Sequence, residues 1–259
     1  MSNPLLENTA LPQFSKIEPQ HIQPAIEQLI NQCRDTVEQV LKQPHLDWNN
    51  FCQTLAEVND RLSRAWSPVS HLNSVKNSPE LREAYQACLP LLSEYGTWVG
   101  QHKGLYNAYL QLKNNLEFAS YSEAQKKAIE NNLRDFKLSG ISLPEAQQKR
   151  YGEIVSRLSE LSSQFSNNVL DATMGWDKVI EDENLLKGLP ESALQAAQQS
   201  AQSKGLSSYR FTLEIPSYLP VMTYCENPEL RAEMYQAFVT RASDQGPTAG
   251  KWDNTAIMA

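Results

Sequence analysis

Apolar residues recur every three or four positions over most of this chain, a period that only an α-helix turns into one continuous apolar face. The first such stripe runs from residue 22 to residue 41. It consists of Ile22, Ile26, Leu29, Ile30, Cys33, Val37, Val40 and Leu41. Glycine, at 10 of 259 residues, is too scarce for a turn-rich β architecture or a glycine-rich nucleotide fold. The pattern therefore predicts a mainly α protein.

Further stripes and helix-start signals divide the first two thirds of the chain into helices. Asp47 is a good N-cap for a second helix, and we expect Ser67-Pro68 to interrupt that helix. Ser78-Pro79 begins a third helix, which we expect to be kinked at Pro90. Two further helices are expected over residues 105–116 and 122–138. In the second of these, Glu123 and Lys127 are expected to pair, and Gly140 ends the helix. A long helix through residues 151–169 is expected to follow the capping-box spacing of residues 142–145.

The pattern changes after residue 173. Residues 176–181 and 209–215 favour β-strands, and we expect them to pair antiparallel around a helix over 190–204 that ends at Gly205. A last strong helix begins at Asn227-Pro228 and runs through Arg241. We therefore expect two domains, a helical one over 1–173 and a second over 174–259 that combines a β-hairpin element with helices.

The end of the chain is helix-favouring but short. Asp253 is the expected cap of a helix of barely one turn, and we expect residues 254–259 to fray unless a partner surface supports them. Residues 243–251 are expected to form a loop.

Composition limits the class of partner. The net charge of −7 disfavours a nucleic-acid role, because phosphate binding needs a basic face. Mean hydropathy is −0.51, and no run approaches the ~18 apolar residues of a membrane span. The N-terminus lacks the basic region and apolar core of a signal peptide, so we expect a cytoplasmic, reducing location without membrane partners.

Residues that could carry chemistry are present but scattered. Four cysteines, Cys33, Cys52, Cys88 and Cys225, lie among apolar neighbours and are expected to be buried thiols; a zinc site built from them would lack a motif. Four histidines, His21, His45, His71 and His102, never stand four residues apart, so the His-Glu-x-x-His zinc motif is absent.

Other motifs are weaker. Residues 246–251 are one position too short for a phosphate loop and are followed by Trp252, so an ordinary loop is expected, and no Gly-x-Ser-x-Gly elbow occurs. Five tryptophans are expected to be core anchors more often than substrate platforms: Trp48, Trp66, Trp98, Trp176 and Trp252. The residues alone supply no catalytic or metal-binding set, and they leave any substrate-binding residues unknown.

Several segments resemble the N-terminal region of the thimet oligopeptidase-like family of zinc metallopeptidases, and the resemblance covers nearly the whole chain. The matching segments are residues 67–83, 91–95, 150–154, 165–173, 215–222 and 240–246. The resemblance implies a multi-helix N-terminal half that forms one wall of a deep channel and limits substrates to short unfolded peptides.

The family's zinc motif lies in a C-terminal half that this sequence does not contain. There, zinc would polarise the scissile carbonyl and a glutamate would deprotonate the attacking water. The resemblance thus implies that the full-length enzyme binds zinc, that the residues of this chain do not bind it, and that the chain alone is inactive. It also implies two partners, which are short peptide substrates and the C-terminal half. The alternative is a stand-alone helical peptide-binding or scaffold protein without catalysis.

Overall fold

The computed structural model describes residues 3–259, which form ten α-helices and a small two-stranded antiparallel sheet. The expected mainly α fold with a β-hairpin element is therefore confirmed. The chain divides into two compact units, one ending at Glu160 and the other spanning Leu161–Ala259. The domain boundary expected at 173/174 stays a prediction.

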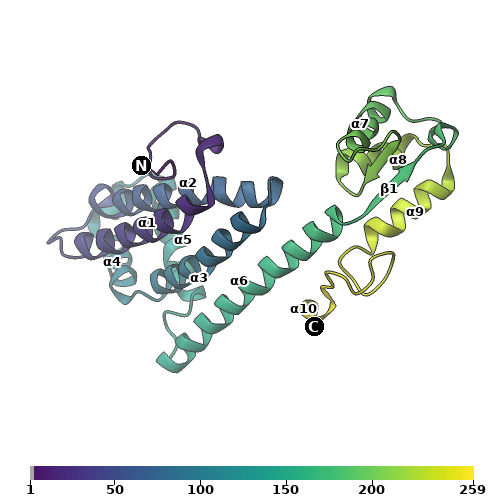
Figure 1. Ribbon diagram of the computed structural model, residues 1–259. Helices are drawn as coiled ribbons and strands as arrows, with labels where there is room; N and C mark the ends of the chain where they lie inside the picture. Colours follow the sequence, from purple (N-terminus) through teal and green to yellow (C-terminus); the bar gives the residue numbers. More distant parts are fainter. Residues whose placement is uncertain (1–2) are drawn as a thin grey trace. The chain divides into compact units, whose positions relative to one another are not determined.

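The first unit is all helical. Its helices are α1 (Pro19–Val40), α2 (Thr54–Val75), α3 (Pro79–Gly100), α4 (Lys103–Asn114), α5 (Glu123–Leu138) and the first half of α6 (Glu145–Met174), with 3-10 turns at Phe14–Lys16 and Leu116–Ser120 and a π-helical turn at Trp48–Gln53. Helices α1, α2 and α3 lie side by side (Figure 1).

Two apolar cores hold this unit together, and both use the stripe of α1. The N-terminal half of α1 packs with α2 and α3 around side chains such as Ile26 and Val69. Its C-terminal end, from Val37, packs with α4 and α5 around Phe51 and Ile129. One continuous apolar stripe thus serves two cores in succession along the same helix.

Polar caps fix where these helices begin and end. Asp47 Oδ1 accepts from Asn50 N at 2.8 Å, and Ser122 Oγ accepts from Gln125 N at 3.3 Å. Gly140 adopts a φ of +83° just after α5, a left-handed conformation that stops the helix as expected.

Three expectations for this unit are wrong in detail. Pro68 does not interrupt the second helix: it is buried within α2, where core packing outweighs the roughly 3 kcal/mol cost of an interior proline. The long helix begins at Glu145, so Glu145 is its first residue rather than the third residue of a capping box. Glu123 pairs with Lys126, at 3.0 Å, rather than with Lys127.

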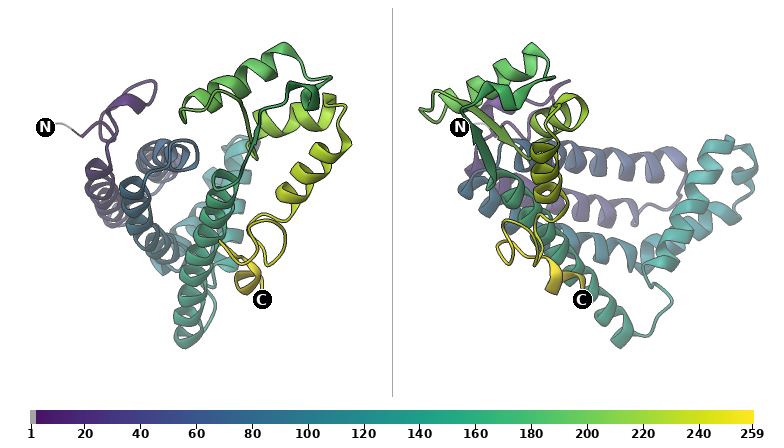
Figure 2. Two further views of the ribbon diagram at one scale, coloured as in Figure 1. Left: turned by 45° about the vertical axis from the view of Figure 1, so that its right-hand side comes forward. Right: turned by 90° about the vertical axis from the view of Figure 1, so that its right-hand side faces the viewer.

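The second unit surrounds the sheet. Strand β1 (Asp177–Ile180) pairs antiparallel with β2 (Tyr209–Thr212), and the helices are α7 (Glu191–Gln202), α8 (Ile215–Tyr224), α9 (Pro228–Val239) and α10 (Thr255–Met258), with a 3-10 turn at Glu183–Leu186. The pairing expected from sequence is confirmed. Both views of Figure 2 draw α8 and α9 next to each other.

The sequence did not predict α8. The second strand ends at Thr212, and Ile215 starts this helix with Pro216 in its first turn, a position where the missing N–H costs little. Helix α8 contributes Val221 to a third core, which also contains Phe211, Leu213 and Met234.

The segment after α9 folds back onto α6. Trp252 has a positive φ of 59°, and a Cβ atom at Gly175 would overlap its ring, so glycine is needed for this approach. Asn254 is 4% exposed and anchors the segment: Asn168 Nδ2 donates to Asn254 Oδ1 at 2.8 Å, and Asn254 Nδ2 donates to the Phe165 carbonyl at 3.2 Å. Asn254 therefore contacts α6 of its own chain, and the fraying expected for residues 254–259 stays a prediction.

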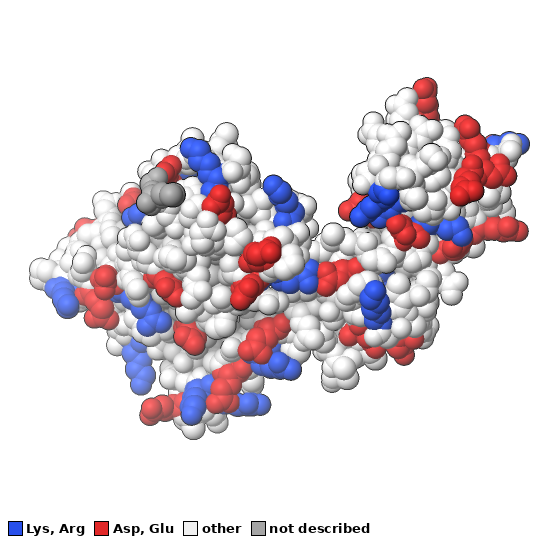
Figure 3. Space-filling model, in the orientation of Figure 1, with Lys and Arg blue, Asp and Glu red and all other residues white. Residues whose placement is uncertain are grey.

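Two surface properties bear on possible partners. None of the helices formed by residues 3–259 combines the length and apolarity that crossing a membrane requires. Lys and Arg are intermixed with Asp and Glu over the face shown in Figure 3.

Candidate functional site

Metal-binding side chains do not converge in this structure. Among residues 3–259, no group of three or more His, Cys, Asp or Glu side chains lies close enough to hold a metal ion. The donor set of this part of the chain therefore does not fit a zinc site.

The four histidines have separate local roles. His21 Nδ1 accepts from Glu18 N at 3.1 Å, and His102 Nδ1 accepts from Leu105 N at 3.1 Å, so each caps the start of a helix. His45 lies 3.8 Å from a carboxylate oxygen of Glu117, and the His71 ring packs against Phe14.

All four cysteines are buried, as the sequence predicted. Burial raises the pKa of Cys52 to about 12 and that of Cys88 to about 11, and it also raises the pKa of Cys33. These three thiols therefore stay protonated and unreactive at neutral pH.

The tryptophans are less deeply buried than expected. Only Trp176 is fully buried within the described part of the chain; the other four are half-buried. Trp66 stacks on Tyr85 with ring centroids 4.7 Å apart, which fixes its ring at the edge of the first core. Residues 246–251 form turns after a helix, not a strand-to-helix phosphate loop.

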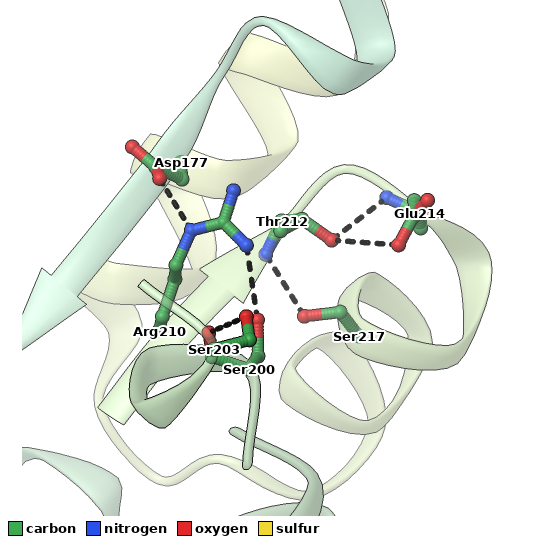
Figure 4. Close-up of polar contacts among 7 residues, drawn as sticks. All are labelled: Asp177, Ser200, Ser203, Arg210, Thr212, Glu214 and Ser217. Carbon is green, nitrogen blue, oxygen red and sulfur yellow. Dashed lines mark hydrogen bonds and ion pairs between the residues drawn. The ribbon is translucent and has the colours of Figure 1, made fainter. Parts of the chain in front are cut away.

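A polar cluster gathers on one side of the small sheet (Figure 4). Arg210 lies opposite Val179, and its Nε donates to the Asp177 carboxylate at 2.5 Å. The same guanidinium donates from Nη1 to Ser200 Oγ of α7 at 3.0 Å, while its side chain remains only 14% exposed. The ion pair thus joins the two strands, and the hydrogen bond to Ser200 links β2 to α7.

The start of α8 completes the cluster. The backbone N–H of Thr212 donates to Ser217 Oγ at 2.9 Å, and Glu214 N lies 3.4 Å from Thr212 Oγ1. Residues of β2, α7 and α8 enclose a cavity of about 160 Å³. That volume is well below the ~300–1,000 Å³ of small-molecule sites.

This arrangement stabilises structure and supplies no catalytic set. Both donors of Arg210 that face the cluster are already engaged, by a carboxylate and a hydroxyl. No histidine or reactive thiol is among the residues that line the cavity. Sequence reasoning missed this cluster, although the alternation of residues 209–212 does place Arg210 and Thr212 on one face of the strand.

The sequence matches the model of a known protein family over part of its length. Residues 26–149 match the family model described as "Neurolysin/Thimet oligopeptidase, N-terminal domain". Over those residues the chain is similar to that family, and the resemblance inferred from the sequence is confirmed.

Individual relatives match over essentially the whole chain. It is 76% identical over 258 residues to oligopeptidase A of Haemophilus influenzae and 63% identical over 260 residues to oligopeptidase A of Escherichia coli. It is 38% identical over 264 residues to a probable cytosolic oligopeptidase A of Arabidopsis thaliana. The chain spans about 38% of the length of the two bacterial relatives and 37% of the plant protein.

Proposed function

We propose that this chain is the N-terminal, channel-wall region of a zinc-dependent oligopeptidase that hydrolyses short unfolded peptides in the cytoplasm. The observation that carries the proposal is the 76% identity to oligopeptidase A along the full chain, over only 38% of that relative's length. A role in restricting and holding substrate agrees with a helical scaffold in which, among the described residues, no three potential zinc ligands lie together.

Zinc and the acid–base groups would come from residues outside this sequence, so no catalytic step is assigned to residues 1–259. What this region contributes is a rigid surface. The first apolar core fixes α1, α2 and α3 against one another, the second fixes the end of α1 against α4 and α5, and the Arg210–Asp177 ion pair joins the two strands of the sheet.

Photo-crosslinking tests the wall role. A ten-residue peptide carrying a photoreactive side chain is bound to the full-length protein after zinc removal, so that the peptide is not cleaved. We expect crosslinks within residues 1–259 that an unlabelled short peptide displaces, whereas an excess of a folded protein does not displace them. Crosslinks confined to the remainder of the protein would refute the role.

A second experiment addresses the chain alone. We expect residues 1–259, purified after expression by themselves, to bind less than stoichiometric zinc in metal analysis and to leave short peptides intact. Peptide cleavage that a chelator abolishes would contradict the proposal. Saturable peptide binding by a chain whose natural reading frame ends at residue 259 would favour a stand-alone binding protein instead.

A further inference from the structure

The N-terminal segment covers a cavity on the first unit that the peptidase proposal does not use. Residues 4–13 form a loop beside α1 and α2 (Figure 1) and, together with both helices, line a cavity of about 290 Å³. Its accessible apolar lining comes from the half-buried side chains of Leu6 and Ile17, while the buried Leu29 of α1 and Pro68 of α2 lie beneath.

Hydrogen bonds hold the covering segment in place at both ends. Asn3 Nδ2 donates to the carbonyl oxygen of His21 at 2.7 Å, and Leu5 is buried in the first core. Farther along, Arg64 Nη2 donates to the carbonyl oxygen of Thr9 at 2.6 Å. The cavity is therefore a formed feature of the fold, and a ligand would enter a site that is already shaped.

Two guanidinium groups line the same cavity. Arg61 and Arg64 stand three residues apart on α2, which places them one above the other on one helix face. Among residues 3–259, the structure shows no carboxylate within ion-pair distance of either one. Their positive charge is thus available to a ligand.

One acidic side chain limits the charge that the cavity favours. Glu7 also lines it, with Oε2 accepting from Gln13 Nε2 at 2.9 Å. Two guanidinium groups and one carboxylate are therefore among the lining groups, so the cavity favours a small anion over a cation. The volume of about 290 Å³ lies just below the ~300–1,000 Å³ range of small-molecule sites, which suits a molecule the size of one amino acid.

We propose that this cavity binds a small monocarboxylate with an aliphatic tail, its carboxylate on Arg61 and Arg64 and its tail against Leu6 and Ile17. Arginine suits this task because its planar donors match a carboxylate. The site is independent of the peptidase proposal, and either can fail without the other.

Calorimetric titration of the full-length protein tests the site with N-acetyl-leucine as the probe. N-acetyl-leucinamide removes the charge and N-acetylglycine removes the tail, and we expect each to bind at least about tenfold more weakly. Comparing N-acetyl-leucine with a longer acetylated peptide that ends in leucine shows whether the site prefers a free small molecule or the C-terminus of a peptide. Saturable binding of either one supports the site, and the one that binds more tightly identifies the source of the carboxylate.

Variants locate the binding. We expect Arg61→Gln and Arg64→Gln each to weaken binding about tenfold or more, and Arg134→Gln, at an exposed arginine of α5 paired with Asp135, to leave it unchanged. Arg64 also donates a hydrogen bond to Thr9 of the covering segment, so its substitution could loosen that segment as well as remove a charge. Among the described residues, Arg61 shows no hydrogen bond to the segment. Arg61→Gln therefore tests the loss of charge alone. No saturable binding, equal binding of the amide, or full binding by Arg61→Gln would each overturn the proposal.

Discussion

Replacing Asn254 with alanine tests how the last segment of the second unit is held. The side chain makes two hydrogen bonds, to Asn168 at 2.8 Å and to the Phe165 carbonyl at 3.2 Å, while only 4% exposed. Each is worth about 1 kcal/mol, and the Asn168 donor left without its partner adds up to about 1 kcal/mol more. The Phe165 carbonyl adds less, since it lies within helix α6. The expected loss is about 2–3 kcal/mol.

Hydrogen exchange measures that loss where it occurs. The backbone N–H of residue 254 donates to the Ala242 carbonyl at 3.0 Å in the native protein, and alanine retains this group. We expect its protection to fall about 30- to 150-fold in Asn254→Ala, which corresponds to 2–3 kcal/mol. Asn132→Ala is the matched control, because Asn132 makes a single exposed hydrogen bond within α5. Protection within twofold of the unsubstituted protein would refute the anchoring role.

Three further predictions concern the same fold. Gly175→Ala is expected to cost about 1–3 kcal/mol in urea unfolding and to change Trp252 fluorescence, because a Cβ would overlap that ring; an unchanged midpoint and spectrum would contradict this. Cys52 and Cys88, with pKa values of about 12 and about 11, should not react with a thiol reagent at pH 8 until guanidinium unfolds the protein, so fast native labelling would show the burial to be wrong. Hydrogen bonds from Thr255 hold the pKa of Asp253 below its usual value. The stability that the Asp253 carboxylate gives to α10 is therefore present above about pH 4 and is lost as the pH falls through the lowered pKa. Asp253→Asn should abolish this acid dependence of amide exchange in α10, and an unaltered pH profile would count against it.

Local sequence predicted the helices well where an apolar stripe and a cap agree. Residues 22–41 and 122–138 are examples, since the spacing of apolar residues along one helix already marks the face that packs against other helices. The antiparallel pairing of residues 177–180 with 209–212 was also predictable from strand propensity. The expectation failed at Pro68, because the burial that keeps α2 continuous comes from other helices.

Features that depend on distant segments could not be read from the sequence. Two prolines and a preceding alternating strand concealed α8, which gains its stability by packing on β2 and α9. The Arg210 cluster requires the register of the two strands, and the N-terminal cavity requires residues 4–13 to fold back over α2. Neither juxtaposition leaves a motif at a fixed spacing along the chain.

The positions of the three apolar cores along the chain also set the order in which they can form during synthesis. The first core draws on residues 5–99, the second on 37–141 and the third on 176–238. During synthesis, each set of partners emerges from the ribosome before the third set begins, and domains generally fold as units in that order. A nascent chain stalled near residue 175 would already carry every side chain of the first two cores. Translation itself can therefore guide this chain through folding, with no early core waiting for a partner still to be made.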